Sequence, residues 1–289
     1  MTVLLKAQPL VDARLPELQN RCQLLIRQGI RPKLVVVLVG DHPASLSYIT
    51  KKRELCERVG ASFELRHLAA TSTAEELKAV VESINRDASV HGCIIQLPVQ
   101  GPAKSLPLES LVAPKKDVDG FHPQNTSALY LGKLTEHSLL PCTPKGVMSV
   151  LKHYGIDPGG MNAVVIGRSQ IVGKPLALLL SLAGATVTIC HSGTRDLAEH
   201  TKRADLIVCA AGAIDLLRAR HIDPTKQSVV IDVGVSRNAA GKLVGDVKFA
   251  EVAPLVKAIT PVPGGIGPLT VLSLIENLLI AAQNLKDAP

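Results

Sequence analysis

Short aliphatic runs alternate with amphipathic stretches twice along this chain, and this pattern limits its possible folds more than any other feature. In the first half the aliphatic runs are 34–39, 63–68 and 93–96, and the amphipathic stretches between them are 43–59 and 73–87. In the second half the runs are 163–166, 186–190, 206–209 and 229–233. Parallel strands that helices cover on both faces give such runs. The sequence therefore predicts an α/β fold with two units, and Ser72-Thr-Ala-Glu75 predicts a capping box at the start of one helix.

Composition excludes several classes of function. The chain of 289 residues is 46% hydrophobic and 20% charged, which is typical of a globular protein rather than a disordered one. Aromatic residues make up only 2% of the chain, so binding of nucleic-acid bases by stacking is not expected. The net charge of +7 is spread evenly, which favours mild attraction to anions over a nucleic-acid-binding tail. We expect a small-molecule ligand and no nucleic-acid partner.

The cysteines are widely separated and form no C-x-x-C pair: Cys22, Cys56, Cys93, Cys142, Cys190 and Cys209. Most of them lie inside apolar runs, so we predict reduced core thiols in a cytosolic protein, with neither a metal site nor a disulfide framework. The most apolar stretches, 176–190 and 269–282, are too short to span a membrane, and the N-terminus has no long apolar core. We expect no signal peptide and no membrane anchor.

One lysine falls on the apolar side of the helix predicted over 43–59. At about 100° per residue, one arc of that helix contains Tyr48, Ile49, Leu55, Cys56 and Val59. Lys52 lies near the middle of this arc, one turn after Tyr48. Burial lowers the pKa of a lysine and makes its amino group usable for proton transfer near neutral pH. Alternatively, the stem of Lys52 packs inward while its ammonium group reaches water, and the helix alone favours this second interpretation.

Two further polar elements follow aliphatic segments. Gln96 ends the strand Ile94-Ile95-Gln96 and precedes Leu97-Pro98, at the carboxyl end where α/β proteins place ligands. Its amide either holds a buried lysine without adding charge or belongs to an exposed loop. Asp117 and Asp119, in Pro114-Lys-Lys-Asp-Val-Asp-Gly120, either grip polar donors or form an Asx-turn, and alone the turn is favoured.

The second unit begins with a strand, a glycine-bounded turn and a helix, which is the arrangement of dinucleotide-binding folds. Gly167 follows the strand and Gly173-Lys-Pro175 begins the helix, so that the first amides of the helix point at an anion. The spacing is not G-x-G-x-x-G, and an ordinary tight turn is the alternative. The next strand ends in Ile189-Cys-His-Ser192 with no acidic residue before Asp196, whereas Arg168, Ser169 and Ser192 suit a 2′-phosphate. NADP is therefore favoured over NAD, and the absence of G-x-x-x-x-G-K-[ST] argues against a P-loop.

A dense run of proline and glycine, residues 260–270, precedes the last amphipathic stretch at 269–285. Its backbone can approach a flat ligand closely, or it forms a rigid hinge. The segment from Pro114 to about Cys142 has little periodicity, which is typical of a domain junction, and junctions are where clefts form.

Together these elements resemble the bifunctional methylenetetrahydrofolate dehydrogenase/methenyltetrahydrofolate cyclohydrolase family. The motifs, in order along nearly the whole chain, are Ser45-x-x-Tyr48-x-x-x-Lys52, Gln96-Leu97-Pro98, Lys116-Asp-Val-Asp119-Gly120, Pro141-Cys-Thr-Pro-Lys-Gly146, Gly167-Arg-Ser-x-Ile-Val-Gly173-x-Pro175 and the Pro-Gly-Gly run at 263–265. The departures are small: Ile266, Leu269 and Ser236 stand where the family has Val, Met and Asn.

The resemblance implies a role for each matching residue. Lys52 would be the general acid/base of the hydrolysis, Gln96 would orient it and tune its pKa, Tyr48 would stack on the folate, and Asp119 would hydrogen-bond the pterin. The same pocket would be lined by Leu97, Pro98, Pro263, Gly264 and Gly267. NADP would be bound by Cys142, Thr143, Gly167, Arg168, Ser169, Ile171, Gly173, Ser192, Val235 and Thr270.

The resemblance also implies a bifunctional cytoplasmic enzyme of one-carbon metabolism that supplies purine biosynthesis, with tetrahydrofolate derivatives as substrates and a homodimer formed through Rossmann domains. We predict an N-terminal folate-binding domain of residues 1–141, a Rossmann-like NADP-binding domain of 142–267 and a C-terminal helix of 268–289 that returns to the first domain. Two alternatives remain. One is a regulatory protein that binds nucleotide without catalysis, and the other is an unrelated dehydrogenase acting on shikimate or an amino acid.

Overall fold

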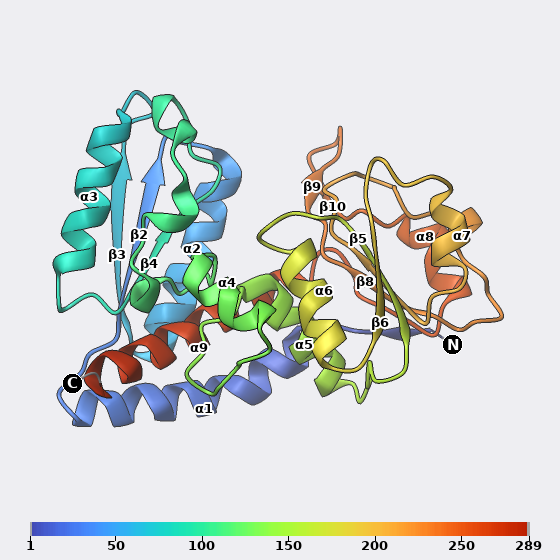
Figure 1. Cartoon of the computed structure of the whole chain (residues 1–289), viewed down its shortest axis with the longest axis horizontal. Coiled ribbons are helices and arrows are strands. Elements are labelled where there is room, and N and C mark those ends of the chain that lie inside the picture. Colours follow the sequence, from blue (N-terminus) through green and yellow to red (C-terminus); the bar gives the residue numbers. More distant parts are fainter. Residues whose placement is uncertain (1, 288–289) are drawn as a thin grey trace. The chain divides into compact units, whose positions relative to one another are not determined.

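The computed structural model describes residues 2–287, and the chain divides into two compact units (Figure 1). We call Ala13–Cys142 with Val271–Pro289 the three-stranded unit and Met1–Asp12 with Thr143–Thr270 the six-stranded unit. The predicted α/β class is confirmed. The predicted domain of 1–141 includes the first strand, β1 (Val3–Leu4). In the structure β1 pairs in parallel with β11 (Ala258–Ile259) and so belongs to the six-stranded unit.

The three-stranded unit is built on a small parallel sheet. Its strands are β2 (Lys33–Val39), β3 (Ser62–Leu68) and β4 (Gly92–Ile95), in the order β3-β2-β4. The chain passes from β2 to β3 through α2 (Pro43–Val59) and from β3 to β4 through α3 (Ala74–Arg86). These two crossovers run in opposite directions along the sheet, and since such crossovers are right-handed, α2 and α3 cover opposite faces (Figure 1).

Hydrophobic spacing explains how α3 packs. Its buried residues Leu77, Val81 and Ile84 recur at helical spacing, and they share one core cluster with alternate residues of β2, namely Val35, Val37 and Val39. The predicted capping box is displaced by one residue: Thr73, not Ser72, accepts from the Glu76 amide, and Glu76, not Glu75, bonds back to the Thr73 amide. The helix itself occurs where the sequence predicts it.

Loops and short helices complete this unit. After β4 come three 3-10 turns, Pro102–Ser105, Leu108–Ser110 and Pro114–Lys116, and then α4 (Pro123–Tyr130). The unit also contains most of α1 (Gln8–Arg27) and of α9 (Ile266–Asp287). The helix α4 lies within the segment from Pro114 to about Cys142 that was predicted as a domain junction, and the sequence pattern did not indicate it.

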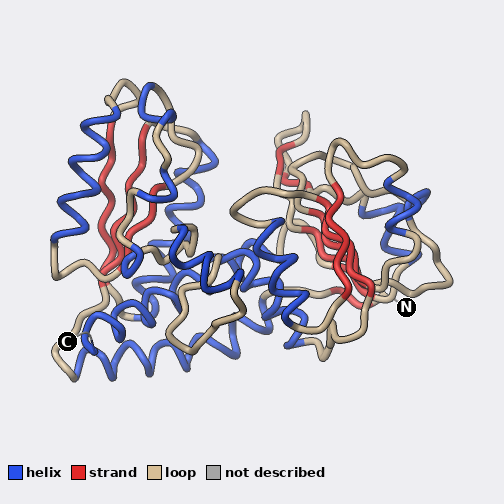
Figure 2. Tube along the Cα trace, viewed as in Figure 1, coloured by secondary structure: helices blue, strands red, loops and turns tan. Residues whose placement is uncertain are grey.

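The six-stranded unit is a doubly wound parallel sheet in the order β1-β11-β8-β7-β5-β6 (Figure 2). Its four longest strands are β5 (Asn162–Ile166), β6 (Thr186–Cys190), β7 (Leu206–Cys209) and β8 (Val229–Asp232), all close to the predicted ranges. The helices are α5 (Cys142–His153), α6 (Gly173–Leu182), α7 (Leu197–Thr201) and α8 (Phe249–Val252), with 3-10 turns at Ala219–His221 and Ala253–Leu255 and an antiparallel pair β9 (Ser236–Arg237) and β10 (Leu243–Val244).

The strand order of this sheet locates its ligand crevice. From β5 the chain moves through α6 to β6 on one side and then returns to β7 on the other. Strand order therefore reverses between β5 and β7, and doubly wound sheets bind ligands outside the carboxyl ends of the strands at such a point. The residues that follow Ile166 and Cys209 are placed at this crevice.

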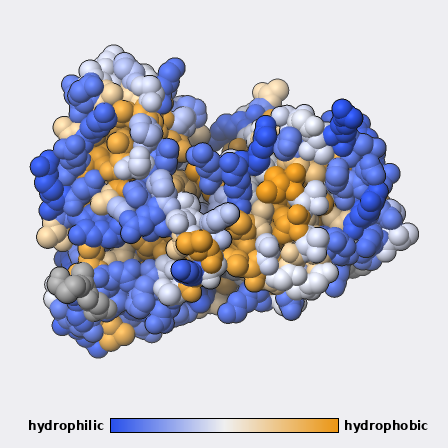
Figure 3. Space-filling model, in the orientation of Figure 1, coloured by the Kyte–Doolittle hydropathy of each residue, from blue (hydrophilic) through white to orange (hydrophobic). Residues whose placement is uncertain are grey.

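The helix α9 is longer than the sequence suggested. Residues Ile266–Lys286 are long and apolar enough to cross a membrane, with a mean hydropathy of 1.5, so the prediction that this stretch is too short is wrong. However, 72% of its most apolar window is buried inside the protein, which is typical of a core helix. Hydrophilic residues predominate on the face shown in Figure 3, with smaller apolar areas among them.

Candidate functional site

Lys52 is held inside the three-stranded unit by a side chain from another element. It is only 4% exposed, so its ammonium group does not reach water as the alternative interpretation required. Its Nζ donates a hydrogen bond of 2.9 Å to Gln96 Oε1 and lies 5.0 Å from the centre of the Tyr48 ring. The spacing Ser45, Tyr48, Lys52 places all three on one side of α2, which is why the phenol and the amine meet.

Gln96 is itself fixed at the carboxyl end of β4. Its backbone amide donates to Val37 O, which continues the parallel ladder by one residue. Its side-chain Nε2 donates to Leu97 O (2.9 Å), and Ser45 Oγ donates to the same carbonyl (3.2 Å). With its NH₂ group committed to a backbone carbonyl, the amide presents its oxygen to Lys52. Leu97 and Pro98 follow on the exposed surface.

Burial and one nearby carboxylate have opposite effects on this lysine. Burial lowers the pKa of Lys52, whereas the negative charge of Asp119 opposes that fall. Burial raises the pKa of Asp119, and the Lys52 ammonium group opposes that rise. Each group therefore favours its neutral form more than it would in water. A neutral amine beside a carboxyl group can accept a proton and return it near neutral pH.

The two aspartates of the Asp-Val-Asp motif have different tasks. Asp117 is 4% exposed and accepts from the backbone amides of Gly120 (3.1 Å) and His122 (2.7 Å) and from Asn125 Nδ2 (2.9 Å). It therefore forms the Asx-type turn that the sequence left as one alternative. Asp119 is the carboxylate whose charge acts on Lys52.

Asn277 on α9 takes part in this site and was not identified from the sequence. It is fully buried, and its Nδ2 donates to the carbonyls of Val118 (2.8 Å) and Leu140 (2.7 Å). Cys142 Sγ, 1% exposed, also bonds Val118 O (3.2 Å). Asn277 thus secures the residue before Asp119. The only signal in the sequence was a polar pair, Glu276-Asn277, within an otherwise aliphatic helix.

The loop after β5 in the six-stranded unit has the close backbone packing expected of a nucleotide site. A Cβ added at Gly167, where φ is +135°, would overlap the Ala210 carbonyl, and one added at Gly173 would overlap the Gly167 carbonyl. Ser169 Oγ accepts from the amides of Val172 (3.2 Å) and Gly173 (3.3 Å). Both glycines are thus required where the chain turns from β5 into α6.

The amide groups available to an anion differ from those predicted. The first amides of α6 are already occupied by Ser169, so the expectation that they point at a ligand is not met. Among the described residues, by contrast, none accepts a hydrogen bond from the backbone amides of 168–171. Arg168, Ser169 and Ile171 are exposed in the same loop. The loop itself, and not the helix end, offers free donors.

The structure places the other predicted residues as follows. Thr143 Oγ1 and Thr270 Oγ1 are hydrogen-bonded to each other (3.1 Å) in the six-stranded unit. Ser192 follows β6 and is exposed, as is Val235 after β8. Gly264 accepts from the Ala7 amide, and Pro263, Gly264 and Gly267 belong to the six-stranded unit, whereas Cys142 belongs to the three-stranded unit. Their ligand-binding roles stay predictions.

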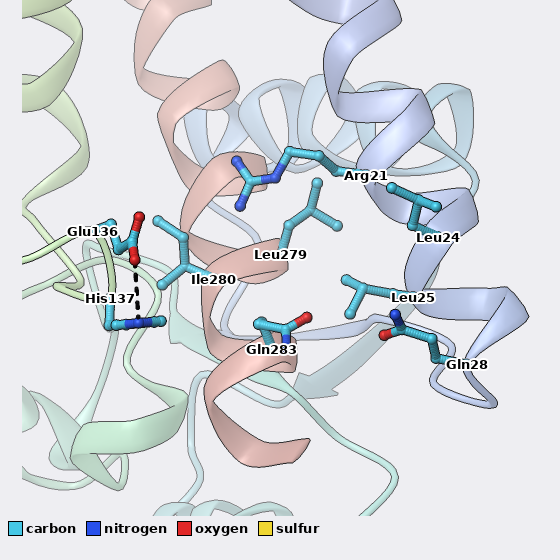
Figure 4. A pocket seen from close by; sticks show the side chains of 9 residues that line it. All are labelled: Arg21, Leu24, Leu25, Gln28, Glu136, His137, Leu279, Ile280 and Gln283. Atoms are coloured by element: carbon cyan, nitrogen blue, oxygen red, sulfur yellow. Dashed lines mark ion pairs between the residues drawn. The ribbon is translucent and has the colours of Figure 1, made fainter. Parts of the chain in front are cut away.

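A groove of about 350 Å³ lies elsewhere in the three-stranded unit (Figure 4). It is lined by Arg21, Leu24, Leu25, Gln28, Glu136, His137, Leu279, Ile280 and Gln283. None of these is a predicted site residue. All six cysteines are free and buried, which confirms the prediction of core thiols, and the described residues contain no group of three or more metal-ligating side chains.

Known proteins resemble this chain along nearly its whole length. Residues 5–119 match "Tetrahydrofolate dehydrogenase/cyclohydrolase, catalytic domain", and residues 141–286 match "Tetrahydrofolate dehydrogenase/cyclohydrolase, NAD(P)-binding domain". The bifunctional protein FolD of Campylobacter jejuni is 48% identical over 270 residues, which cover 93% of this chain and 94% of that protein.

Solved structures agree with this. The crystal structure of the FolD methylenetetrahydrofolate dehydrogenase/cyclohydrolase from Campylobacter jejuni has a TM-score of 0.92 and 44% identity, covering 98% of this chain and 99% of that chain. The methylenetetrahydrofolate dehydrogenase-cyclohydrolase of Trypanosoma brucei, complexed with NADP cofactor and inhibitor, has a TM-score of 0.93 and 33% identity, covering 99% of each chain.

Proposed function

The chain belongs to the tetrahydrofolate dehydrogenase/cyclohydrolase family, and on this premise we propose that it carries both activities. The protein oxidises 5,10-methylenetetrahydrofolate to 5,10-methenyltetrahydrofolate with NADP⁺ and hydrolyses that product to 10-formyltetrahydrofolate. The observation that carries this proposal is the buried Lys52 bound to the neutral Gln96 Oε1, because an amine held in this way can exchange a proton, which a nucleotide-binding regulator does not need.

The six-stranded unit fits NADP. Its loop at 168–171 offers backbone amides to phosphate oxygens, and Gly167 leaves room for the close approach of chain and ligand. Arg168 and Ser169 follow β5, and Ser192 follows the neighbouring strand β6, whose end carries no acidic residue to hold an unphosphorylated ribose. NADP⁺ supplies the hydride acceptor for the oxidation, and Ile171, Gly173, Val235, Thr143 and Thr270 complete its proposed site.

The three-stranded unit supplies the proton chemistry. Loss of hydride leaves the methenyl carbon cationic, and a permanently charged amine beside it would oppose that step. A neutral Lys52 avoids this repulsion, accepts a proton as water attacks the same carbon, and returns it to nitrogen as the ring opens. Gln96 keeps the amine in place, because its own amide is fixed by Leu97 O.

Tyr48 and Asp119 hold the folate in this proposal. The Tyr48 ring, next to Lys52 on α2, offers a flat surface for the pterin. The Asp119 carboxyl group suits the guanidine-like edge of the pterin, which presents two N–H donors. Leu97, Pro98, Pro263, Gly264 and Gly267 are proposed to line the same ligand.

The assembly and cellular setting are also part of the proposal. The strand β6 is the last of its sheet and pairs only with β5 within the described residues. Ile189 on β6 and Leu182 at the end of α6 are 40% and 52% exposed. A second copy covering this edge would form a homodimer through the six-stranded units. We place the enzyme in the cytoplasm, where 10-formyltetrahydrofolate supplies purine biosynthesis.

A spectrophotometric assay tests the proposed function. Purified protein is given 5,10-methylenetetrahydrofolate with NADP⁺ or with NAD⁺, and reduced cofactor is followed, then decay of the methenyl product. We expect faster reduction with NADP⁺, and methenyl decay faster than the uncatalysed rate. Reduction without accelerated decay would remove the cyclohydrolase from the proposal, and no reduction with either cofactor would return the protein to the class of nucleotide-binding regulators.

A further inference from the structure

We propose that Asp232 and Asp246 are positioning residues for NADP: together they fix the backbone on two sides of the crevice at the carboxyl ends of β7 and β8. This inference rests on the proposed use of NADP. Both side chains are buried, at 3% and 0% exposure, and no predicted role of the chain accounts for them.

Asp246 anchors the turn after β7. Its Oδ2 accepts from the backbone amides of Ala211 (2.7 Å) and Gly212 (3.0 Å), 35 and 34 residues away in sequence. Gly212 has a φ of +67°, a left-handed conformation that favours glycine in this turn. Two hydrogen bonds to one carboxylate oxygen therefore hold the turn in a single position.

Asp232, the last residue of β8, anchors the segment that carries Asp246. Its Oδ1 accepts from the amides of Gly234 (3.1 Å) and Asp246 (3.0 Å), and its Oδ2 accepts from Val247 (3.0 Å). The backbone amide of Asp232 donates to Thr260 Oγ1 (2.7 Å). The two aspartates thus form a chain of contacts from β8 through residues 246–247 to the turn after β7.

This chain of contacts ends at the nucleotide crevice. Ala210 lies directly before the anchored turn. Its carbonyl is so close to Gly167 that a Cβ added to Gly167 would overlap it. Ala210 N also donates to Ile166 O, at the point where strand order reverses. On the other side, Gly234 precedes Val235, which is 57% exposed and is a proposed NADP contact. Movement of either anchor would move the proposed site.

Two glycines make room for the carboxylates. A Cβ on Gly234 would overlap Asp246 Oδ1, and a Cβ on Gly245 would overlap Asp232 Oδ2. Neither glycine needs a positive φ, so the space itself explains both residues. In the Asp-Val-Gly run at 232–234, Asp232 thus supplies one carboxylate, and the missing side chain of Gly234 leaves the space that the Asp246 carboxylate occupies.

The arrangement costs stability, which argues that it serves more than the fold. Asp246 Oδ1 is buried and has no hydrogen-bond partner among residues 2–287, and an unsatisfied buried acceptor is destabilising. Burial, together with the Asp246 carboxylate, raises the pKa of Asp232 to about 7. Asparagine at 246 would keep one oxygen for the two amides and remove a buried charge.

Two substitutions of Asp246 test this inference. Asp246→Ala should raise the KM and Kd for NADP⁺ by about 10-fold or more, as expected for the loss of two charge-assisted hydrogen bonds. Asp246→Asn should stay within about 3-fold of the wild type, because the anchoring oxygen remains. Cyclohydrolase activity without NADP⁺ should be unchanged in both, since Lys52 and its partners lie in the other unit. Asp223→Ala removes a half-buried turn carboxylate that bonds Thr225; it is the matched control and should change neither activity.

Binding of NADP⁺ to the wild-type protein is measured first. If the wild type does not bind NADP⁺, the proposed function is wrong; if it binds, the variants test the inference. An unchanged affinity in Asp246→Ala would overturn the inference, and so would an Asp246→Asn variant as weak as Asp246→Ala. If Asp246→Ala does not fold, as judged by lost cyclohydrolase activity, Asp232→Asn replaces it. That variant keeps one of two acceptor oxygens, so intact cyclohydrolase with weakened NADP⁺ binding supports the inference, and unchanged binding contradicts it.

Discussion

Two lysines are buried in the three-stranded unit, and their surroundings differ. Lys52 is 4% exposed and Lys116 is 2% exposed, and burial lowers the pKa of both. Lys116 Nζ donates to two backbone carbonyls, Ile84 O (2.9 Å) and Asp87 O (2.6 Å), at the C-terminal end of α3. Lys52 Nζ has one side-chain acceptor, Gln96 Oε1, and an aromatic ring.

This difference distinguishes a structural lysine from a reactive one. The carbonyls at a helix C-terminus carry partial negative charge and favour an ammonium group, so Lys116 completes α3 best in its charged form. Lys52 instead has a single neutral acceptor, the Gln96 amide, and its amine can lose and regain a proton. Burial is thus common to both residues, and the acceptors decide what each one does.

The largest expected effect on stability comes from removing Lys116. Lys116→Met leaves two carbonyls without their charged donor, and we expect it to lower the free energy of unfolding by about 2 kcal/mol. Lys52→Met removes a buried ammonium group with one neutral acceptor, so its change should stay within about 1 kcal/mol. Urea unfolding of both variants, with the exposed Lys51→Met as control, measures the difference. Equal losses of unfolding free energy in Lys116→Met and Lys52→Met would contradict the distinction between the two lysines.

Asn277→Leu should act on activity. Loss of its Nδ2 removes one donor from each of the carbonyls of Val118 and Leu140, and Asp119 is then less firmly held beside Lys52. We expect both activities to fall about 10-fold, the order of a misplaced catalytic contact. Asn284→Leu is the matched control, since Asn284 lies on the same helix and its side chain bonds the exposed His137. A similar fall in both variants would point to a general effect of changing α9.

A smaller effect concerns the pH profile. Because the neutral amine is the base, cyclohydrolase activity should rise with pH through the lowered pKa of Lys52. The Asp119 carboxylate raises that pKa, so Asp119→Asn should move the rise to lower pH, as well as weakening folate binding. The measurement is kcat against pH for the methenyl substrate. A shift to higher pH would contradict the electrostatic account.

Local patterns predicted much of this molecule. The helix over 43–59 begins at a proline and ends at Gly60, where φ is +93°, so its register and the inward place of Lys52 follow from spacing alone. The strands β2, β4, β5, β7 and β8 are mostly aliphatic and were found for the same reason, whereas the two-residue strands β1, β9, β10 and β11 were not predicted. The capping box was misplaced by one residue because Ser72-Thr73 and Glu75-Glu76 each offer two adjacent candidates, and only packing selects between them.

Contacts between distant residues could not be predicted. Asn277 bonds carbonyls 159 and 137 residues away, and no periodicity records that meeting. The same holds for Lys116, whose place in a motif with two aspartates did not reveal that it completes α3. Likewise, the occupation of the first α6 amides by Ser169 depends on the exact turn, which the glycine spacing did not define.

The most direct test of the role of Lys52 compares the two activities in one variant. In Lys52→Met, hydrolysis of 5,10-methenyltetrahydrofolate and NADP⁺-dependent oxidation of 5,10-methylenetetrahydrofolate are measured on the same preparation, beside Lys51→Met. The account predicts that Lys52→Met loses the hydrolysis and retains the oxidation, because only the hydrolysis needs a proton acceptor at that position. Wild-type rates for both reactions in Lys52→Met would contradict it.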